Sequence, residues 1–255
     1  MFTRVKSPQE LEAMRESGRM LATVLHHLKP LVVDGITTKE LASAAAAELK
    51  ALGGQAPFLG YPGGPGSFPD VICISINDEV VHGVPSPHKR ISEGDIVGLD
   101  FGVKYRGMVT DSAISVIAGK PRDPRHVELL KYTEAAMMAG IGALHDGVKT
   151  GDIGAAIEAV LKLKKYGIVR DLVGHGVGDE MHEDPNVPNY GRAGTGKALS
   201  AGMTIAIEPM ATLGGERVYI GDDNWTILTY DGSWAAHFEH TVAVTPDGFE
   251  IMSTL

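Results

Sequence analysis

SEGDIVGLD, residues 92–100, returns later in the chain as SAGMTIAIE, residues 200–208. Both segments read Ser-x-Gly, five residues and then an acid, with a constant offset of 108 (92 to 200 and 100 to 208). An acid after an apolar strand is costly to bury, because the ionised form loses its hydration. A single buried acid of this kind could be neutralised by a neighbouring arginine. Two of them, Asp100 and Glu208, at equivalent points of a duplicated unit indicate a shared site, and a metal ion is the simplest way to neutralise it.

The duplication also includes a helix-forming stretch in each half. The matching segments are DGITTKEL (34–41), followed by the alanine-rich Ala42–Leu52, and DGVKTGDI (146–153), followed by Gly154–Leu163. Thr37 and Glu40 have the spacing of a capping box, which marks a helix start. Gly53 and Gly167 follow the last apolar turns, and a glycine there is typical of a helix C-cap. We therefore expect a helix in each unit, closing at these glycines.

The remaining pattern favours helices followed by strands in each half. Two further helices are expected at Pro8–Leu28 and at Pro124–Leu144, the second with Asp123 as its N-cap. Short β-rich runs lie at Val71–Ile76, Asp95–Val103, Ser112–Ala118, Thr204–Ile207, Trp225–Leu228 and Thr241–Thr245. This order favours an α+β fold with a pseudo-twofold axis over an alternating βαβ sheet. We expect structured irregular loops at Gly60–Pro69 and Gly214–Asp223.

Composition narrows the class of protein. The chain has 255 residues, of which 44% are hydrophobic and 22% charged, as is ordinary for a soluble globular protein. Its net charge of −9 argues against a general nucleic-acid surface, which must neutralise phosphates. The single cysteine, Cys73, excludes an internal disulfide and suits a reducing compartment. No secretory signal or membrane-length apolar segment is visible, so we expect a cytoplasmic protein.

Three further residues join the two repeat acids in a candidate site. Asp111 and Glu239 follow Asp100 and Glu208 as a second acid in each half, and His175 lies in the glycine cluster GHGVG. Taken singly, each has an ordinary explanation: a turn aspartate, an edge-strand glutamate facing water, a structural histidine. Together, four carboxylates and a neutral imidazole carry a charge of −4, which two divalent cations would balance. Such a pair of ions is a hydrolase arrangement, and the donors suit Mn, Fe, Co or Zn.

The motifs of the chain resemble those of the type I methionine aminopeptidases, pita-bread metallopeptidases of the M24 family. The matching motifs are VVHGVPS, EGDIVGLDFGV, TDSA, GHGVG, MHEDP, IEPM and FEHT, in the family's order and over nearly the whole length. The resemblance implies a pita-bread fold with a central antiparallel sheet and pseudo-twofold-related halves, approximately 1–120 and 121–255. It also implies one catalytic domain over residues 1–255.

The resemblance also implies roles for individual residues. The metal ligands would be Asp100, Asp111, His175, Glu208 and Glu239, with Asp111 and Glu239 bridging the two ions. Glu208 would also act as the general base. His182 would polarise the scissile carbonyl, and His82 would contact the scissile amide nitrogen. The implied reaction removes the N-terminal methionine of peptides and nascent proteins, through attack of a metal-activated hydroxide on the first peptide bond.

By the same resemblance, an apolar slot takes the methionine side chain. Its wall would comprise Phe58, Tyr61, Cys73, Met181 and Trp225, and with His82 and His182 these would bind substrate. Aromatic and sulfur-bearing side chains suit a flexible thioether. The chain departs from its bacterial relatives here, because Phe58 and Met181 stand where Cys and Phe are common. The loop Pro62–Asp70 is also longer, so the shape of the slot differs from the family's pattern.

Two other functions remain compatible with the motifs. A different pita-bread peptidase, such as an Xaa-Pro type, would share the ligands, and a non-catalytic binding paralogue would share the fold. The interval of 33 residues between His175 and Glu208 (175 to 208) leaves no room for the helical insertion of type II relatives. We expect a monomer without membrane or specific nucleic-acid partners. The family also suggests ribosome contact, to which a basic cluster of Lys162, Lys164, Lys165 and Arg170 would contribute unless it is simply a solvated helix face.

Overall fold

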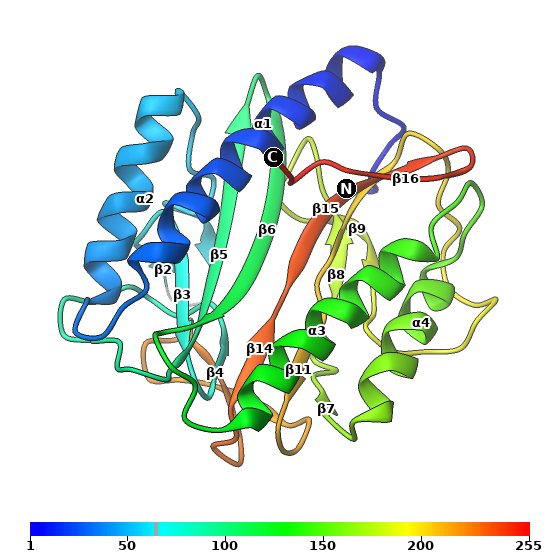
Figure 1. Ribbon diagram of the computed structural model, residues 1–255. Coiled ribbons are helices and arrows are strands. Elements are labelled where there is room, and N and C mark those ends of the chain that lie inside the picture. The colour runs from blue at the N-terminus through cyan, green and yellow to red at the C-terminus, as the bar shows by residue number, and fades with distance from the viewer. Residues whose placement is uncertain (64–65) are drawn as a thin grey trace.

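The helices form two pairs, one from each half of the sequence (Figure 1). We describe a computed structural model that covers residues 1–63 and 66–255, so Gly64 and Pro65 of the expected loop Gly60–Pro69 lie outside the described residues. The helices are α1 (Pro8–Leu28), α2 (Thr38–Leu52), α3 (Pro124–Gly142) and α4 (Thr150–Leu163), with a short 3-10 turn at Lys29–Leu31. All four agree with the helices expected from the sequence to within a few residues.

Local capping explains where these helices begin and end. Thr37 and Glu40 form the expected capping box at the start of α2, and Gly53 ends that helix in the left-handed conformation. The expected cap at Gly167 is wrong, because α4 already ends at Leu163. Gly167 instead belongs to the short strand β7, where a side chain would overlap the Thr212 hydroxyl. Gly167 therefore allows β7 to pack closely against Thr212, and it does not end a helix.

One antiparallel sheet of eight strands runs through both halves. Its strand order is β3-β5-β6-β15-β10-β8-β9, and β16 pairs with β15. The strands are β3 (Cys73–Ile76), β5 (Ile96–Tyr105), β6 (Met108–Ile117), β8 (Gly174–Gly176), β9 (Glu183–Val187), β10 (Thr204–Ile207), β15 (Glu239–Thr245) and β16 (Gly248–Ile251). The order is symmetric about its centre: β6 and β15 meet there, β5 and β10 flank them, and β3 and β8 lie outside. The two repeats thus form one sheet.

Smaller sheets and a hairpin surround the large sheet. A sheet of order β14-β11-β7 and another of order β12-β13-β4 are present, and β1 pairs with β2. Their strands are β1 (Pro62–Gly63), β2 (Gly66–Ser67), β4 (Glu79–Val81), β7 (Gly167–Ile168), β11 (Met210–Thr212), β12 (Val218–Ile220), β13 (Ile227–Thr229) and β14 (Ala235–His237). Both expected irregular loops therefore contain short strands, β1 and β2 in the first and β12 in the second.

Side-chain alternation along the strands separates the core from the site. Leu99 and Phe101 of β5 pack in one core cluster with residues of α1 and α2. Ile205 and Ile207 of β10 pack in a second cluster with residues of α3 and α4. Because successive side chains of a strand point to opposite faces, Asp100 lies on the face of the sheet away from the helices. Glu208 directly follows Ile207 and is placed on that same face by the same alternation.

Candidate active site

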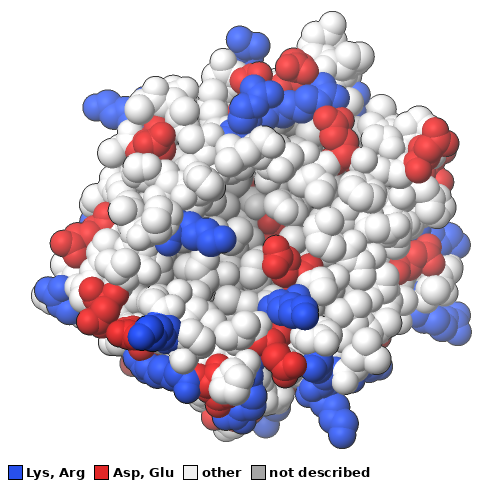
Figure 2. Space-filling model, viewed as in Figure 1, with Lys and Arg blue, Asp and Glu red and all other residues white. Residues whose placement is uncertain are grey.

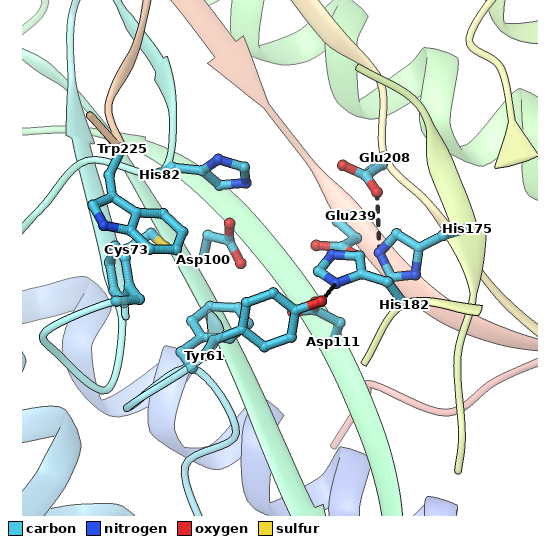
Figure 3. Close-up of a pocket in the computed structure, with 12 residues that line it drawn as sticks. Tyr61, Cys73, His82, Asp100, Asp111, His175, His182, Glu208, Trp225 and Glu239 are labelled. Atoms are coloured by element: carbon cyan, nitrogen blue, oxygen red, sulfur yellow. Dashed lines mark hydrogen bonds and ion pairs between the residues drawn. The ribbon is translucent and has the colours of Figure 1, made fainter. Parts of the chain in front are cut away.

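The five metal-ligand candidates from the sequence line one cavity (Figure 3). They are Asp100 on β5, Asp111 on β6, His175 on β8, Glu208 directly after β10 and Glu239 at the start of β15. Four of these side chains are buried, whereas that of Glu208 is 14% exposed. The explanations that placed single acids in solvated turns or on edge strands therefore do not hold. Asp111 also lies inside β6, whereas the strand expected from the sequence began only at Ser112.

The pairing of β6 with β15 at the centre of the sheet, which we call the central seam, fixes the backbone of Asp111 and Glu239. The Asp111 backbone N–H donates to the Thr241 hydroxyl at 2.8 Å, and that hydroxyl donates to the Asp111 carbonyl at 2.8 Å. The Ser112 hydroxyl donates to the Glu239 carbonyl at 2.6 Å. These bonds cross between β6 and β15, so each half of the chain holds the acid of the other half in place.

His175 presents one ring nitrogen to the cavity. Its Nδ1 lies 2.9 Å from the carbonyl oxygen of Gly176, to which it donates, so Nε2 carries the free lone pair. Burial lowers the pKa of His175 to about 3, with a smaller contribution from His182. The 3.3 Å approach of its Nε2 to Glu208 Oε1 is therefore not an ion pair at neutral pH. A neutral imidazole with an oriented lone pair is suited to bind a metal ion.

Several oxygens of the four carboxylates have no hydrogen-bond partner in the described part of the protein. Among the described residues, Asp100 Oδ1, Asp111 Oδ1 and Glu239 Oε1 are buried without a hydrogen-bond partner. Burial raises the pKa of Asp100, Glu208 and Glu239, and the neighbouring carboxylates raise it further. Ligand atoms of Asp111, His175 and Glu239 lie within 4.8 Å of one another. Oxygen and imidazole donors that need a compensating positive charge fit divalent metal ions.

Two more histidines reach the cavity from loops. The hydroxyl of Tyr61 lies 2.6 Å from Nδ1 of His182, and the rings of His182 and His175 are 4.3 Å apart (Figure 3). His82 has a left-handed backbone conformation (φ 59°) directly after β4. Burial, and to a lesser degree His182, lowers the pKa of His82 to about 4. Both histidines predicted to be catalytic therefore line the same cavity as the metal-ligand candidates.

An apolar slot adjoins these polar groups. Phe58, Tyr61, Cys73 and Trp225 line it as expected, and Phe68 is an additional member that the sequence reasoning missed. The ring of Phe68 stands edge-on to Phe58 and Trp225, at centroid distances of 6.4 and 5.2 Å. Its only signal in the sequence was its place in an unusually long loop. Met181 packs in the same apolar cluster but is not among the lining residues.

A further histidine was also missed. Nε2 of the buried His237 lies 3.7 Å from Glu208 Oε2, and this nitrogen has no hydrogen-bond partner among the described residues. Ser115 holds the backbone of His237, accepting from its N–H at 3.0 Å and donating to its carbonyl at 2.8 Å. The available signal was its position two residues before Glu239.

Comparison with known proteins identifies the family. The model for metallopeptidase family M24 matches residues 12–246. The chain belongs to this family. The M24 chain is 41% identical to methionine aminopeptidase 1 of Bacillus subtilis, over 97% of its own length and 98% of that protein. The resemblance to methionine aminopeptidases that the motifs indicated is confirmed.

Solved structures confirm the fold of this M24 protein. A methionine aminopeptidase from Thermotoga maritima superposes with a TM-score of 0.95 at 39% identity, with both chains fully covered. A prolidase from Pyrococcus furiosus gives a TM-score of 0.77 at 22% identity, covering 98% of this chain and 65% of that one. The second likeness shows the fold alone. The expected α+β pita-bread fold is therefore confirmed.

Proposed function

We propose that this M24 metallopeptidase removes the N-terminal methionine from peptides and nascent proteins. One observation carries the proposal: a donor set suited to divalent ions lies directly beside an apolar slot lined by aromatic side chains. The similarity to methionine aminopeptidases over nearly the full length supports the same conclusion. The slot would take the methionine side chain, and its contact with the donor set would place the first peptide bond at the ligands.

The metal centre is proposed to hold two divalent ions. Their ligands would be Asp100, Asp111, His175, Glu208 and Glu239, with Asp111 and Glu239 between the two ions, and Co, Mn, Fe and Zn all suit these donors. When bound, the ions supply Lewis acidity, which generates a nucleophile from water at neutral pH and polarises the scissile carbonyl. Glu208, the least buried of the four acids, would accept the proton of that water and pass it to the leaving amine.

The two loop histidines would act on the substrate itself. If the Tyr61 hydroxyl donates to Nδ1 of His182, the proton of the neutral ring lies on Nε2. Nε2 would then donate a hydrogen bond to the substrate's carbonyl oxygen as negative charge develops there. His82, neutral because of its burial, would contact the scissile amide nitrogen. His175 carries the opposite tautomer, which is why it serves as a ligand and not as a donor.

A peptide assay tests this function. Protein supplied with Mn²⁺, Co²⁺, Fe²⁺ or Zn²⁺ in turn is incubated with Met-Ala-Ser and with Xaa-Pro peptides, and the released amino acid is measured. Release of methionine from Met-Ala-Ser alone supports the proposal. Cleavage of the Xaa-Pro peptides instead would identify the other peptidase class. No release with any of the four ions would favour a binding protein.

The slot is expected to control affinity for methionine. We predict that Phe68→Ala lowers kcat/KM for Met-Ala-Ser about tenfold or more, because Phe58 and Trp225 lose the ring that holds them against the thioether. Most of the change should appear as a raised KM. Phe249→Ala, at an exposed position on β16, is the matched control and should leave both constants unchanged. An unaltered KM in Phe68→Ala would remove Phe68 from the slot.

The cellular setting and assembly are also proposed. No helix in the described parts of the chain is long and apolar enough to cross a membrane. We propose that residues 1–255 act as one catalytic domain, as a monomer in the cytoplasm, on nascent chains. Figure 2 shows acidic and basic side chains interspersed on the face viewed in Figure 1. Lys162, Lys164 and Arg170 each pair with a glutamate, which favours a solvated helix face, and ribosome contact stays a prediction.

A further inference from the structure

A fully buried lysine lies next to the loop that carries His182. The side chain of Lys6 is 0% exposed, and its Nζ is 3.1 Å from the Thr3 hydroxyl. The same Nζ lies 3.6 Å from Asp179 Oδ2 and 3.5 Å from Glu183 Oε2. A buried ammonium without carboxylate partners is strongly destabilising, so this geometry requires both acids to stay where they are.

The two acids depend on Lys6 in turn. Among the described residues, Asp179 Oδ2 and Glu183 Oε2 are buried without any hydrogen-bond partner. The other oxygen of Glu183 accepts from the Glu180 backbone N–H at 2.9 Å, and the Glu183 side chain is 0% exposed. Asp179 has a second cation, Arg4, at 2.8 Å on its other oxygen, but Arg4 is 41% exposed. Lys6 is therefore the buried charge that neutralises this cluster.

The segment around Lys6 contacts both ends of the same loop, and its backbone also bonds to Gly202 outside that loop. The Thr3 N–H donates to the Asp184 carbonyl at 2.6 Å, and the Lys6 N–H donates to the Gly202 carbonyl at 2.8 Å. At the other end, a side chain at Gly178 would overlap Cε of Lys6, so the lysine stem lies directly against the Gly178 backbone. Lys6 thus contacts the beginning and the end of residues 178–183.

This loop carries His182 without the support of regular structure. Residues 178–182 form neither helix nor strand, and the His182 side chain is exposed at the cavity. The hydrogen bond with Tyr61 restrains the ring, but Tyr61 itself lies in a loop beside the β1–β2 hairpin. The backbone position of His182 therefore depends on how residues 178 and 183 are fixed.

We propose that Lys6 is a positioning residue for His182: its buried ammonium fixes both ends of the 178–183 loop and so places the imidazole at the scissile carbonyl. Lys6 is not among the described residues that line the cavity. This inference rests on the proposed function, because it concerns the step at which His182 acts. A displacement of about 1 Å in such a group lowers turnover by up to about 100-fold.

The first test is a double-mutant cycle with His182. Lys6→Met is expected to lower kcat for Met-Ala-Ser about tenfold or more and to change KM less than kcat, because Lys6 fixes the backbone that carries His182, whereas this loop meets the slot through Met181 and the Tyr61 hydroxyl. In a His182→Ala background, Lys6→Met should cause little further loss. Arg4→Gln is the matched control, because it removes the exposed cation that pairs with Asp179 of the same loop, and it should change kcat less than about twofold. The proposal would be overturned if the loss of kcat in the double variant equalled the product of the losses in the two single variants.

A second measurement does not depend on turnover. Lys6→Met/Glu183→Gln removes both buried charges, so it should fold even if Lys6→Met alone does not. Amide hydrogen exchange in the 178–183 loop should be faster in this variant than in the wild type, while exchange in β5 and β6 stays the same. Unchanged exchange in the loop would overturn the proposal. If the wild type releases no methionine, the proposed function fails, and the exchange measurement still decides whether Lys6 anchors the loop.

Discussion

Replacing Glu208 by glutamine is expected to lower kcat for methionine release from Met-Ala-Ser by about 10²–10⁴-fold, the usual contribution of a general base. The amide keeps the size of the side chain and one oxygen donor, but it accepts no proton. Glu208 also differs from the other three acids in its partial exposure, so it has access to a water molecule at the cavity. The measurement is steady-state release of methionine under saturating peptide and metal ion.

The control for this result is a glutamate of similar reach outside the cavity. Glu216 is 52% exposed and pairs with Arg170 at 2.8 Å, so Glu216→Gln should leave kcat within about twofold of the wild type. Thermal unfolding of both variants checks whether the fold is retained. If Glu208→Gln released methionine at a rate close to that of the wild type, the proton-accepting group would have to be another residue.

Divalent ions are expected to stabilise the protein by a large amount. An ion at about 100 times its Kd adds about 2.7 kcal/mol of stability, which for a chain of this size raises Tm by about 5–10 °C. The physical reason is that four carboxylates share one cavity, and three of their buried oxygens have no partner among the described residues. The measurement compares Tm in excess chelator with Tm after addition of Mn²⁺ or Co²⁺.

In a matched variant, the order of stability relative to the wild type should differ between chelator and metal ion. Asp111→Asn/Glu239→Gln removes two buried charges, so in chelator it should be at least as stable as the wild type. In excess Mn²⁺ the wild type should be the more stable protein, because the variant has lost two anionic ligands. A Tm increase of equal size in both proteins would mean that the ions bind elsewhere.

Local signals explain why much of the fold was predictable. The Thr37 and Glu40 capping box and the apolar stripe of Pro8–Leu28 are properties of neighbouring residues, and both elements form as expected. The repeat placed Asp100 and Glu208 in one site because equivalent strands of a duplicated unit take equivalent places in a sheet. No such signal existed for Lys6, whose burial arises only when a distant loop folds against it.

The residues that the sequence misplaced or missed also depend on contacts with distant parts of the chain. Gly167 looked like a helix cap because a glycine follows the apolar turns of α4, but its lack of a side chain makes room for Thr212 on another strand. Phe68 and His237 have ordinary sequence surroundings, and only tertiary structure brings Phe68 to the cavity and His237 to Glu208. Contacts between residues far apart in sequence are therefore what the sequence alone left open.

The repeat also shows where its two halves have diverged. Cys73 on β3 pairs in register with Asp100 on β5, whereas β8, the strand in the corresponding outer place, carries His175 next to β10. One half thus presents a buried thiol at the wall of the slot, and the other presents an imidazole to the acids. A symmetric scaffold holds a site whose two sides do different chemistry.

The central seam has a consequence for the order of folding. The β5–β6 hairpin forms between neighbouring segments, but the β6–β15 pairing joins Ser112 to Glu239, 127 positions along the chain. Closing so long a loop carries a large entropic penalty, so this pairing is expected to be a late event in folding. Each half of the chain can collapse by itself with its acids still facing water. The four acids come close together only in the last step, when β6 pairs with β15.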